Sequence, residues 1–438
     1  MPRVLNTTNM KIHLLGIAGT KTAPLAIALQ DQGHLVSGSD QDQIFPPIST
    51  LLKRHHIPIN TPLAPSTDLV IVGNSYRSFQ RSRLEYLQAR KLKLPIVSYT
   101  HYLVKNLIKP QSILVAGSYG KTTITALLAF IFLKLKLDPS YMFGGQAVNR
   151  LDSTRFGQSP YSIIEACESI NGLDRQSTFL YYPAKYVVLT SADWEHKDSF
   201  ASSSENFGAF KKLVQKIPSD GLLVYNPQSH SACQAARSCQ GKTIPYDYSI
   251  KIKPLIPGEH NYQNALAAAT LCCHLGLGQK EISPLVGQYR GVKRRLELIS
   301  QKNNLLIYDD FAQSDKRITK ALTAIKEKYP HHRLKVFFEP HASFLQYKQS
   351  LSEFDHTFSL ATEVVLSSLK FSPFIPKDQR VTLKDYQSAI GPKLRYFPDY
   401  QQIAQYFRQT LKPNDVLIHF SSGGLQGLNC LKLIAKIK

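Results

Sequence analysis

Cysteine is scarce in this sequence, and its spacing excludes two kinds of stabilised fold. None of the six cysteines forms a C-x-x-C pair, so neither a zinc site nor a disulfide framework is predicted. Free cysteine behaves as a small hydrophobic residue and is most often buried. We therefore expect reduced, mostly buried thiols at six positions: Cys167, Cys233, Cys239, Cys272, Cys273 and Cys430.

Long apolar runs and a secretory leader are also missing. The longest nearly apolar stretch, residues 125–133, is much shorter than the roughly 20 residues that span a bilayer. The first residues lack the charged start, apolar core and small-residue cleavage site of a signal peptide. The sequence therefore predicts a cytoplasmic protein without a membrane partner.

Acidic residues are few, since 31 Asp and Glu accompany 53 Lys and Arg and leave a net charge of +22. A basic protein can bind nucleic acid, an anionic surface or anionic small molecules. The densest basic stretch covers residues 77–93 and contains one acid, Glu85. No helix-turn-helix, zinc-finger or aromatic-basic signature accompanies it. A solvated surface is therefore favoured over a nucleic-acid site.

The chain is long enough for several cores, and it alternates between strand and helix patterns. Its 438 residues predict two or three domains, and its composition, 43% hydrophobic and 19% charged, is typical of a globular protein. The alternation predicts three α/β blocks, near residues 1–109, 110–293 and 294–438, each with a mainly parallel sheet. Strands are predicted at 11–15, 35–37, 68–72, 113–116, 161–164, 186–190, 222–225, 305–308, 334–338, 363–366 and 416–420, helices include 23–30, 124–135, 261–275 and 316–328, and a linker is expected at 109–112.

A glycine turn follows the first predicted strand. Gly16 and Gly19 lead into the helix at 23–30, which is predicted to be amphipathic, and Asp40 follows the second strand. Glycine at such a turn lets backbone N–H groups approach a phosphate at the helix N-terminus. The G-x-x-G spacing is shorter than the full dinucleotide fingerprint, so a nucleotide site and a plain tight turn both remain open.

The strongest chemical signal is a loop with two glycines and a lysine between a predicted strand and a predicted helix. The glycines free the backbone to wrap anionic oxygens, the lysine supplies positive charge to the phosphates, and the threonine hydroxyl after it can ligate Mg²⁺. Two residues separate the glycines, fewer than in the usual phosphate loop. We predict nucleotide binding by Gly117, Ser118, Tyr119, Gly120, Lys121, Thr122 and Thr123.

Further polar residues lie where later strands are predicted to end. Glu165 ends one strand, with Glu168 nearby, and His196 lies in a carboxylate-rich loop after another. Ligand residues gather at the carboxyl ends of strands in open sheets, and Mg²⁺ needs hard ligands. Asn261 and Asn264 lie one helical turn apart and suit contacts to adenine or phosphate, although Asn261 equally suits a helix cap.

Charged residues also mark the second block boundary and the strand after it. Lys293, Arg294 and Arg295 place three cations there, and domain boundaries are frequent ligand clefts. An arginine that reached across could stabilise charge on a transferring phosphoryl group. Asp309 and Asp310 end the next predicted strand.

Together, these residues resemble the Mur ligases, the ATP-dependent amide-forming enzymes of peptidoglycan synthesis. The resemblance implies a Rossmann-like UDP-sugar-binding domain, a central P-loop ATP-binding domain and a Rossmann-like C-terminal peptide-binding domain. The similar motifs span nearly the whole chain: G-I-A-G-T at 16–20, G-S-D at 38–40, G-S-Y-G-K-T-T at 117–123, E-A-x-E at 165–168, His196, H-N-x-x-N at 260–264, R-R-x-E at 294–297 and D-D-F-A at 309–312.

The resemblance implies that ATP phosphorylates the lactyl carboxylate of UDP-N-acetylmuramate and that an amine then attacks the acyl phosphate. ATP and Mg²⁺ are the implied cofactors, the partners are the sugar nucleotide and a peptide or amino acid, and a monomer or weak dimer is expected. The implied catalytic residues are Lys121, Glu165, His196 and Arg295, and the implied metal ligands are Thr122, Glu165 and His196. Besides the phosphate loop, ATP contacts fall on Asn261, Asn264, Arg295 and Asp310, and UDP-sugar contacts on Gly16, Ile17, Ala18, Gly19, Ser39 and Asp40. Lys121→Ala is predicted to abolish turnover and to leave the fold intact.

Two kinds of Mur ligase accept UDP-N-acetylmuramate itself. One adds L-alanine, and the other, a recycling ligase, adds the tripeptide L-alanyl-γ-D-glutamyl-meso-diaminopimelate. The segments at 38–52, 70–74, 338–340 and 422–427 resemble the recycling ligase more closely, so the tripeptide is the favoured acceptor and L-alanine the alternative.

Two departures from the family pattern keep other functions open. The family's E-A-D-E-Y-D reads E-A-C-E-S-I at 165–170, and its D-D-[FY]-A-H-H-P continues here as Gln313, Ser314 and Asp315. The missing histidine pair favours a second class, a Mur-ligase fold that binds nucleotides without turnover. A third class is a basic, nucleic-acid-binding ATPase.

Overall fold

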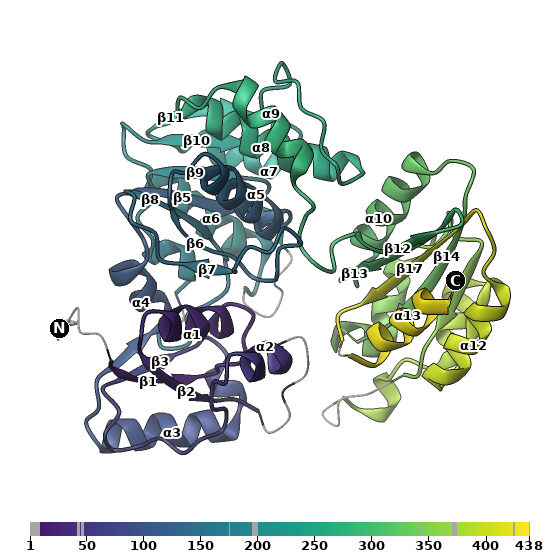
Figure 1. Ribbon diagram of the computed structural model, residues 1–438, viewed down its shortest axis with the longest axis horizontal. Helices are drawn as coiled ribbons and strands as arrows, with labels where there is room; N and C mark the ends of the chain where they lie inside the picture. The colour runs from purple at the N-terminus through teal and green to yellow at the C-terminus, as the bar shows by residue number, and fades with distance from the viewer. Residues whose placement is uncertain are drawn as a thin grey trace. The chain divides into compact units, whose positions relative to one another are not determined.

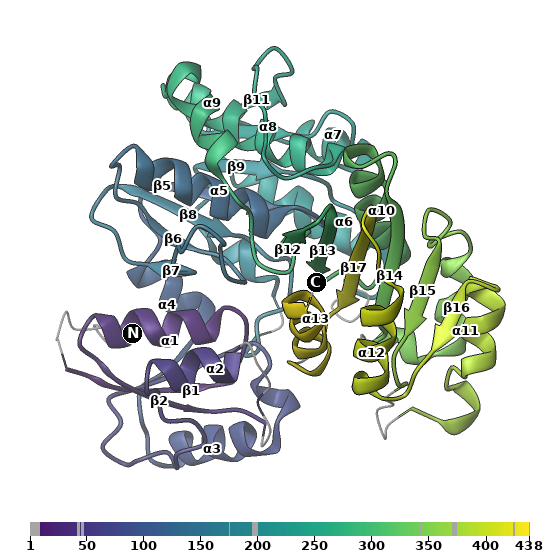
Figure 2. The same ribbon diagram turned by 45° about the vertical axis from the view of Figure 1, so that its right-hand side comes forward.

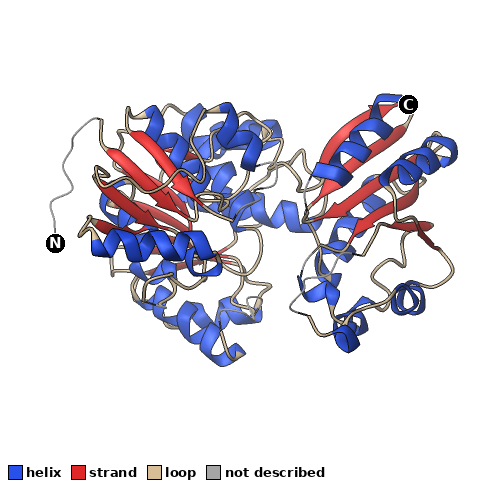
Figure 3. Cartoon of the chain, turned by 90° about the horizontal axis from the view of Figure 1, so that it is seen from below, coloured by secondary structure: helices blue, strands red, loops and turns tan. Residues whose placement is uncertain are grey.

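The computed structural model describes residues 9–41, 44, 48–174, 176–194, 200–341, 343–369, 375–423 and 425–437. These residues fall into two compact units. The first comprises the residues up to 255 together with 261–290, and the second comprises 256–260 and the residues from 291 onward. Three sheets are present in the described residues, and helices flank the strands in each unit (Figures 1 and 3). The α/β class expected from the sequence is confirmed.

The first sheet is fully parallel, with the strand order β2-β1-β3-β4. Its elements are β1 (Lys11–Leu15), α1 (Thr22–Asp31), β2 (Leu35–Ser39), α2 (Ile48–Arg54), β3 (Leu69–Val72), α3 (Gln80–Lys91), β4 (Ile96–Ser98) and α4 (Tyr99–Asn106). Helices α1 and α2 lie on one face and α3 on the other (Figure 2). Strand β3 is apolar and buried along its whole length, as expected where helices cover both faces of a parallel sheet.

The second sheet has seven strands in the order β11-β10-β9-β5-β8-β6-β7, and β6 and β7 form its antiparallel pair. Its elements are β5 (Gln111–Ala116), α5 (Lys121–Lys134), β6 (Ser140–Met142), β7 (Thr154–Arg155), β8 (Tyr161–Glu165), β9 (Tyr186–Leu189), α6 (Ser203–Gln215), β10 (Leu222–Tyr225), α7 (His230–Ala236), β11 (Lys242–Pro245), α8 (Glu259–His274) and α9 (Gln279–Gln288). Strand β5 lies between β8 and β9, so the loop after it emerges at the middle of the sheet.

The third sheet has the strand order β12-β13-β17-β14-β15-β16, with β12 antiparallel to β13. Its elements are β12 (Glu297–Lys302), β13 (Leu305–Asp310), α10 (Asp315–Lys328), β14 (Arg333–Glu339), β15 (Glu363–Leu366), α11 (Leu383–Ile390), β16 (Leu394–Tyr396), α12 (Tyr400–Thr410), β17 (Asp415–Ser421) and α13 (Leu425–Ile437). Leu306 and Tyr308 pack with residues of α10 and α11, whereas Leu305 and Ile307 pack with residues of α12 and α13. This alternation follows from the two-residue period of a strand.

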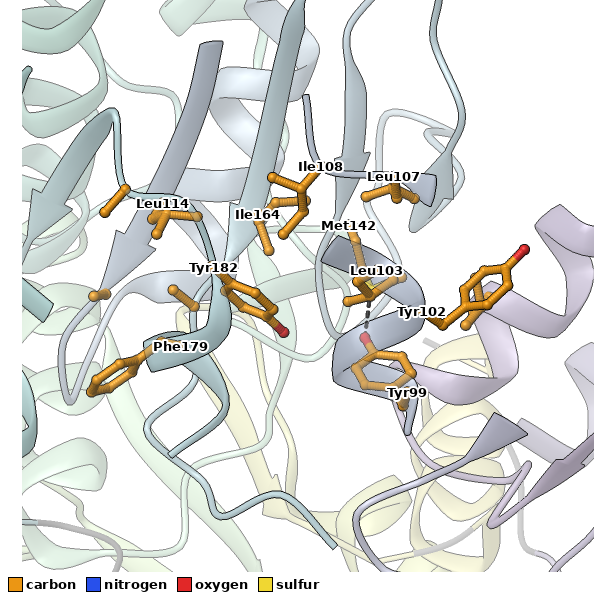
Figure 4. Close-up of a cluster of buried hydrophobic side chains, with 14 of the residues drawn as sticks. Tyr99, Tyr102, Leu103, Leu107, Ile108, Leu114, Met142, Ile164, Phe179 and Tyr182 are labelled. Carbon is orange, nitrogen blue, oxygen red and sulfur yellow. Dashed lines mark hydrogen bonds between the residues drawn. The ribbon is translucent and has the colours of Figure 1, made fainter. Parts of the chain in front are cut away.

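One hydrophobic cluster continues from the first sheet into the second within the first unit. Tyr99 and Leu103 of α4 lie in this cluster with Met142 of β6 and Ile164 of β8 (Figure 4). The hydroxyl of Tyr99 donates to the sulfur of Met142. Because each fully buried large apolar side chain contributes roughly 1.5–3 kcal/mol, this cluster stabilises the association of the two sheets.

Every strand predicted from the sequence is present, with ends within two residues of the expected ones, and β1, β10 and β15 match at both ends. Two other expectations are wrong. Residues 111 and 112 belong to β5 and not to a linker, because they pair with Tyr161 and Ser162 of β8. Helix α1 is not amphipathic, since it is buried from Thr22 to Leu29 and belongs to the cluster that the first two sheets share.

The cysteines depart in part from expectation. All six are free thiols. Cys272 and Cys430 are buried, but the other four are half-buried, so the prediction of mostly buried thiols is wrong for those four. Among the described residues, none of the helices combines the length and the apolar character needed to cross a membrane.

The basic stretch at 77–93 is built around α3. Arg83, Arg90 and Lys91 are exposed, whereas Glu85 is buried. The Glu85 carboxylate lies 3.1 Å from Nε2 of His13 on β1. The cations therefore form the solvent face of a helix whose acid packs inward, which supports a solvated surface.

Candidate active site

Contacts from β2 and its end hold the first glycine turn. Gly16 has a φ of 79°, a conformation that favours glycine. The N–H groups of Gly16 and Ile17 donate to the carbonyl of Ser39 at 2.8 and 3.1 Å, and the N–H of Ala18 donates to Oδ2 of Asp40 at 2.7 Å. Burial raises the pKa of Asp40, although hydrogen bonds from the backbone oppose this shift. Ser39 and Asp40 thus fix the shape of the turn.

A pocket of about 530 Å³ lies next to these residues. Asn60 lines it, and Oδ1 of Asn60 accepts a hydrogen bond from the N–H of Asp40 at 3.0 Å. Gly19 completes the turn by donating to the carbonyl of Gly16 at 3.3 Å. The residues predicted to bind the UDP-sugar therefore lie together beside this pocket, which is lined by Ile44, Ser49, Lys53, His56, Ile57, Pro58, Ile59 and Asn60.

The phosphate loop follows β5 and is tied to the segment after β9. Gly117 has a φ of 128°, and a Cβ placed on it would lie 2.0 Å from Oγ1 of Thr190, so glycine is required there. The hydroxyl of Thr190 donates to the carbonyl of Tyr119 at 2.6 Å. The N–H of Ser118 donates to Oγ of Ser191 at 3.2 Å. These bonds fix the conformation of the loop directly before α5.

Lys121, the first residue of α5, forms a buried ion pair. Its Nζ lies 3.0 Å from Oε2 of Glu168 and also donates to the carbonyl of Gly117. The exposed fraction of the side chain is 10% for Lys121 and 1% for Glu168. Because a buried carboxylate without a partner is costly, Lys121 has a second task besides supplying charge to the loop: it neutralises Glu168.

Glu165 ends β8 and contacts the first glycine turn. Its Oε2 accepts a hydrogen bond from the N–H of Gly144 at 2.6 Å. From the turn, Nζ of Lys21 donates to the main-chain carbonyl of Glu165 at 3.2 Å and lies 3.8 Å from Oε1. Oγ1 of Thr20 lies 3.5 Å from the position that a Cβ on Gly144 would take. The predicted sugar-nucleotide turn therefore contacts the predicted metal ligand.

The two predicted metal ligands among the described residues offer oxygen atoms that suit Mg²⁺. Thr122 and Thr123 lie in the first turn of α5, and the hydroxyl of Thr122 and the carboxylate of Glu165 are the hard ligands that Mg²⁺ prefers, usually together with substrate phosphates and water. Within the described ranges, no group of three or more His, Cys, Asp and Glu side chains could hold a metal ion. A magnesium site here also needs oxygens from a substrate. His196, the third predicted ligand, lies outside the described residues.

Of the two predicted asparagines, Asn264 reaches the phosphate loop. A Cβ on Gly120 would lie 2.2 Å from Oδ1 of Asn264, and the φ of Gly120 is 77°, so the close approach requires glycine. Helix α8 begins at Glu259. Asn261 therefore lies within the first turn and does not cap the helix, which corrects the alternative drawn from the sequence.

Arg295 and Asp310, the remaining predicted ATP contacts, are neighbours in the second unit. The carboxylate of Asp310 accepts the N–H groups of Leu296 and Ala312, both at 2.7 Å. Burial raises the pKa of Asp310, and the guanidinium of Arg295 opposes this shift. That guanidinium lies 5.6 Å from the ring centroid of Phe311. The segment before β12 and the segment after β13 thus contact each other through Asp310 and Arg295.

A buried charge network joins three strands of the second unit. His419 on β17 contacts Asp309 through Nδ1 at 2.7 Å and Glu339 through Nε2 at 2.6 Å, and all three side chains are fully buried. Burial opposes the charge on His419, but the two carboxylates outweigh it and raise the pKa to about 9. Arg294 donates to Asp309 at 3.0 Å and Tyr400 to Glu339 at 2.5 Å. The network fixes the carboxyl ends of β13, β14 and β17.

Gln313, which stands where the Mur ligase pattern has a histidine, lies beside this network. Its Oε1 accepts a hydrogen bond from the N–H of His341 at 3.0 Å. Nε2 of His341 lies 3.3 Å from Oε1 of Glu339, and a Cβ on Gly423 would lie 2.1 Å from Cδ2 of His341. The segment after β14 thus places a histidine next to Gln313.

Comparison with known proteins identifies the family. Three family models match in order: the Mur ligase family catalytic domain over residues 11–108, the Mur ligase middle domain over 115–246 and the Mur ligase glutamate ligase domain over 294–423. A curated protein of Haemophilus influenzae, named UDP-N-acetylmuramate–L-alanyl-gamma-D-glutamyl-meso-2,6-diaminoheptandioate ligase, is 31% identical over 72% of this chain and 76% of its own length. The chain belongs to the Mur ligase family. It is therefore an enzyme of the ATP-dependent, amide-forming ligase class.

Other similar proteins carry both kinds of acceptor in their names. A UDP-N-acetylmuramate–L-alanine ligase of Desulfitobacterium hafniense is 27% identical over 95% of this chain and 98% of its own length. The solved structure of a murein peptide ligase from Psychrobacter arcticus is 25% identical, with a TM-score of 0.69 and coverage of 98% of this chain and 100% of that one. The three-domain Mur ligase architecture expected from the sequence is confirmed, while these names leave the acceptor unresolved.

Three features of this Mur ligase escaped the motif-based interpretation. Lys21 contacts Glu165 across 144 residues, and its signal was a cation directly after a glycine turn. Glu168 was noted near Glu165, but its pairing with Lys121 was not. His419 is an ionisable residue in the middle of a buried, largely apolar strand, and such buried titratable groups often mark functional regions.

Proposed function

We propose that this Mur ligase joins the lactyl carboxylate of UDP-N-acetylmuramate to the amine of L-alanyl-γ-D-glutamyl-meso-diaminopimelate, with ATP and Mg²⁺. One observation carries the proposal: both glycine turns meet at the end of β8. Lys21 of the first turn contacts Glu165, and Lys121 of the phosphate loop contacts Glu168. Two nucleotide-binding turns within one compact unit suit the transfer of a phosphoryl group from ATP to a sugar-linked acid. We place the reaction in the cytoplasm, where ATP and UDP-sugars are available.

The proposed roles follow the position of each group. The phosphate loop holds the triphosphate, and Lys121 offsets the negative charge on the phosphoryl oxygens. Thr122, Glu165 and, from the family resemblance, His196 hold Mg²⁺, which when bound supplies positive charge to the reacting phosphoryl group. The remaining proposed contacts are Asn261 and Asn264 to the nucleotide, Arg295 to the γ-phosphate, Asp310 to the ATP ribose, and Gly16, Ile17, Ala18, Gly19, Ser39 and Asp40 to the UDP moiety.

The reaction asks the protein chiefly for positioning and electrostatics. An oxygen of the lactyl carboxylate attacks the γ-phosphorus, and the bond from that phosphorus to ADP breaks. The acceptor amine then attacks the acyl carbon of the acyl phosphate, and inorganic phosphate leaves. During the first step, negative charge develops on the ADP oxygen that leaves the γ-phosphorus. We assign Lys121 to the stabilisation of this charge, so its contribution to the rate is largest in that step.

The tripeptide is the proposed acceptor because two observations favour it. The Haemophilus influenzae relative, named for the tripeptide, is 31% identical to this chain. The segments at 338–340 and 422–427, which resemble the recycling ligase, contribute Glu339 and Gly423 to the surroundings of His341. L-alanine is the second candidate, since the Desulfitobacterium hafniense relative, named for it, aligns with 95% of the chain. A binding protein without turnover is the third, supported by the replaced residues at 313–315.

One experiment separates these candidates. The full chain is incubated with UDP-N-acetylmuramate, ATP and Mg²⁺, L-alanine and the tripeptide are offered in parallel, and the products are weighed by mass spectrometry while phosphate release is followed. We expect the tripeptide conjugate. A product with L-alanine alone supports the second candidate, and nucleotide binding without either product supports the third. Phosphate release that depends on DNA and falls steeply with salt would instead indicate a nucleic-acid-dependent ATPase.

A further inference from the structure

We infer that Lys21 determines specificity for the sugar nucleotide by binding its lactyl carboxylate. This inference rests on the proposed function and adds a residue to it. Lys21 is the last residue of the first glycine turn and directly precedes α1. Its side chain is therefore carried by the turn that is proposed to hold the UDP-sugar, and it extends toward the strand end that is proposed to hold the metal.

The ammonium of Lys21 has hydrogen-bonding capacity for an anionic partner. Its side chain is 21% exposed, so the residue is partly open to solvent. An ammonium carries three donors. Among the described residues, Nζ makes a hydrogen bond of 3.2 Å to the carbonyl of Glu165 and an ion pair of 3.8 Å to its Oε1, which is longer than a hydrogen bond.

Glu165 is held without the help of Lys21. Its Oε2 already accepts the N–H of Gly144 at 2.6 Å. Its Oε1 lies 3.8 Å from Nζ of Lys21, beyond hydrogen-bond distance. A charged donor therefore stands beside a carboxylate that does not require it.

The association of the first two sheets does not by itself require a lysine at this position. The first two sheets are already joined by the buried cluster that contains Tyr99, Leu103 and Met142. A charged group placed in such a junction costs desolvation energy. An anionic ligand that binds Lys21 during function would offset this desolvation energy.

The proposed chemistry supplies that anion. The lactyl carboxylate and the triphosphate are both negatively charged, and Lys121 stands on the side of the phosphates. Lys21 would offset charge on the side of the sugar while keeping its own proton. The carboxylate oxygen forms a bond to the γ-phosphorus, the bond from that phosphorus to the ADP oxygen breaks, and ADP leaves with the electron pair.

The test compares two sugar nucleotides that differ by the lactyl acid. Titration calorimetry measures the binding of UDP-N-acetylmuramate and of UDP-N-acetylglucosamine to the full chain. A charged hydrogen bond corresponds to a change in affinity of about tenfold, so we expect Lys21→Met to weaken binding of the first ligand by about that factor and to change binding of the second by less than about twofold. Lys21→Arg keeps the charge and should retain most of the preference. Lys11→Met, a change at an exposed lysine on β1 of the same unit, is the matched control.

The outcomes are distinct. An equal loss for both ligands would show that Lys21 only supports the structure, and an unchanged preference would show that it does not contact the acid; either result overturns the inference. Lys21→Gln replaces the methionine variant if that variant melts early. A wild-type chain that prefers the lactyl-bearing ligand but forms no amide refutes the proposed function and leaves the role of Lys21 standing. A wild-type chain that binds neither ligand refutes both.

Discussion

Lys121 has two partners whose loss has separate consequences. Lys121→Ala removes the charge of the phosphate loop and leaves the buried carboxylate of Glu168 without its ion pair. We expect ligase activity to fall by at least about 100-fold and the free energy of unfolding to fall by about 3 kcal/mol. The buried pair thus adds a loss of stability to the expectation, drawn from sequence, that the fold stays intact. Activity assays and thermal unfolding measure the two effects.

The double variant Lys121→Ala, Glu168→Gln separates these effects. Because it also neutralises the buried side chain that has lost its ion pair with Lys121, it should regain most of the lost melting temperature without regaining activity. A single variant that is as stable as the wild type would contradict the assigned ion pair.

His419 makes the stability of the second unit depend on pH. Its pKa is raised from 6.5 to about 9 in the folded chain, so its contribution is complete below pH 6.5 and is lost as the pH rises through 9. The shift corresponds to about 3 kcal/mol. Thermal unfolding between pH 6 and 10 should show this loss, and His419→Gln should lack it. A wild-type profile that stays flat over this interval would argue against a charged His419.

At the scale of elements, the sequence predicted features that depend on neighbouring residues and missed features that depend on tertiary packing. Strand β10 is a continuous apolar run and β15 is apolar after Glu363, as expected where helices cover both faces of a parallel sheet, so their patterns were sufficient. Short edge strands such as β7 and β16 carry too few apolar residues to be recognised. The full burial of α1 depends on the second sheet and leaves no mark in the periodicity of the helix.

The same distinction holds for the candidate site. The phosphate loop is contiguous in sequence, so its residues could be predicted together. The contacts of Lys21 with Glu165 and of His419 with Glu339 join residues that are far apart in sequence. They depend on which strand ends the topology brings side by side, and a single sequence does not specify that.

Helix α11 offers a test of local stabilisation. The hydroxyl of Thr382 accepts the N–H of Asp385 at 3.3 Å, and the carboxylate of Asp385 accepts the N–H of Thr382 at 2.7 Å, which forms a capping box. Thr382→Ala should lower the free energy of unfolding by about 1 kcal/mol. Denaturant unfolding measures this change, and Thr382→Ser, which keeps the hydroxyl, is the control. Equal losses in the two variants would argue against the cap.

At the scale of the molecule, the two units have their own hydrophobic clusters in the described parts of the chain. Scanning calorimetry should therefore resolve two unfolding transitions. UDP-N-acetylmuramate at about 100 times its Kd should stabilise the first unit by about 2.7 kcal/mol, while Thr382→Ala should shift the other transition. One transition for the whole chain, with equal calorimetric and van't Hoff enthalpies, would contradict this independence.

The cluster around Tyr99 and Met142 also determines how this enzyme can be recombined. A junction at residue 290 leaves that cluster whole, whereas a junction near residue 109 divides it. Exchanging residues 294–438 for those of a relative is therefore the conservative graft, because both nucleotide turns are inherited with their spacing unchanged. If residues 294–438 bind the acceptor, as the family resemblance implies, such exchanges would change acceptor preference and leave the first unit unaltered.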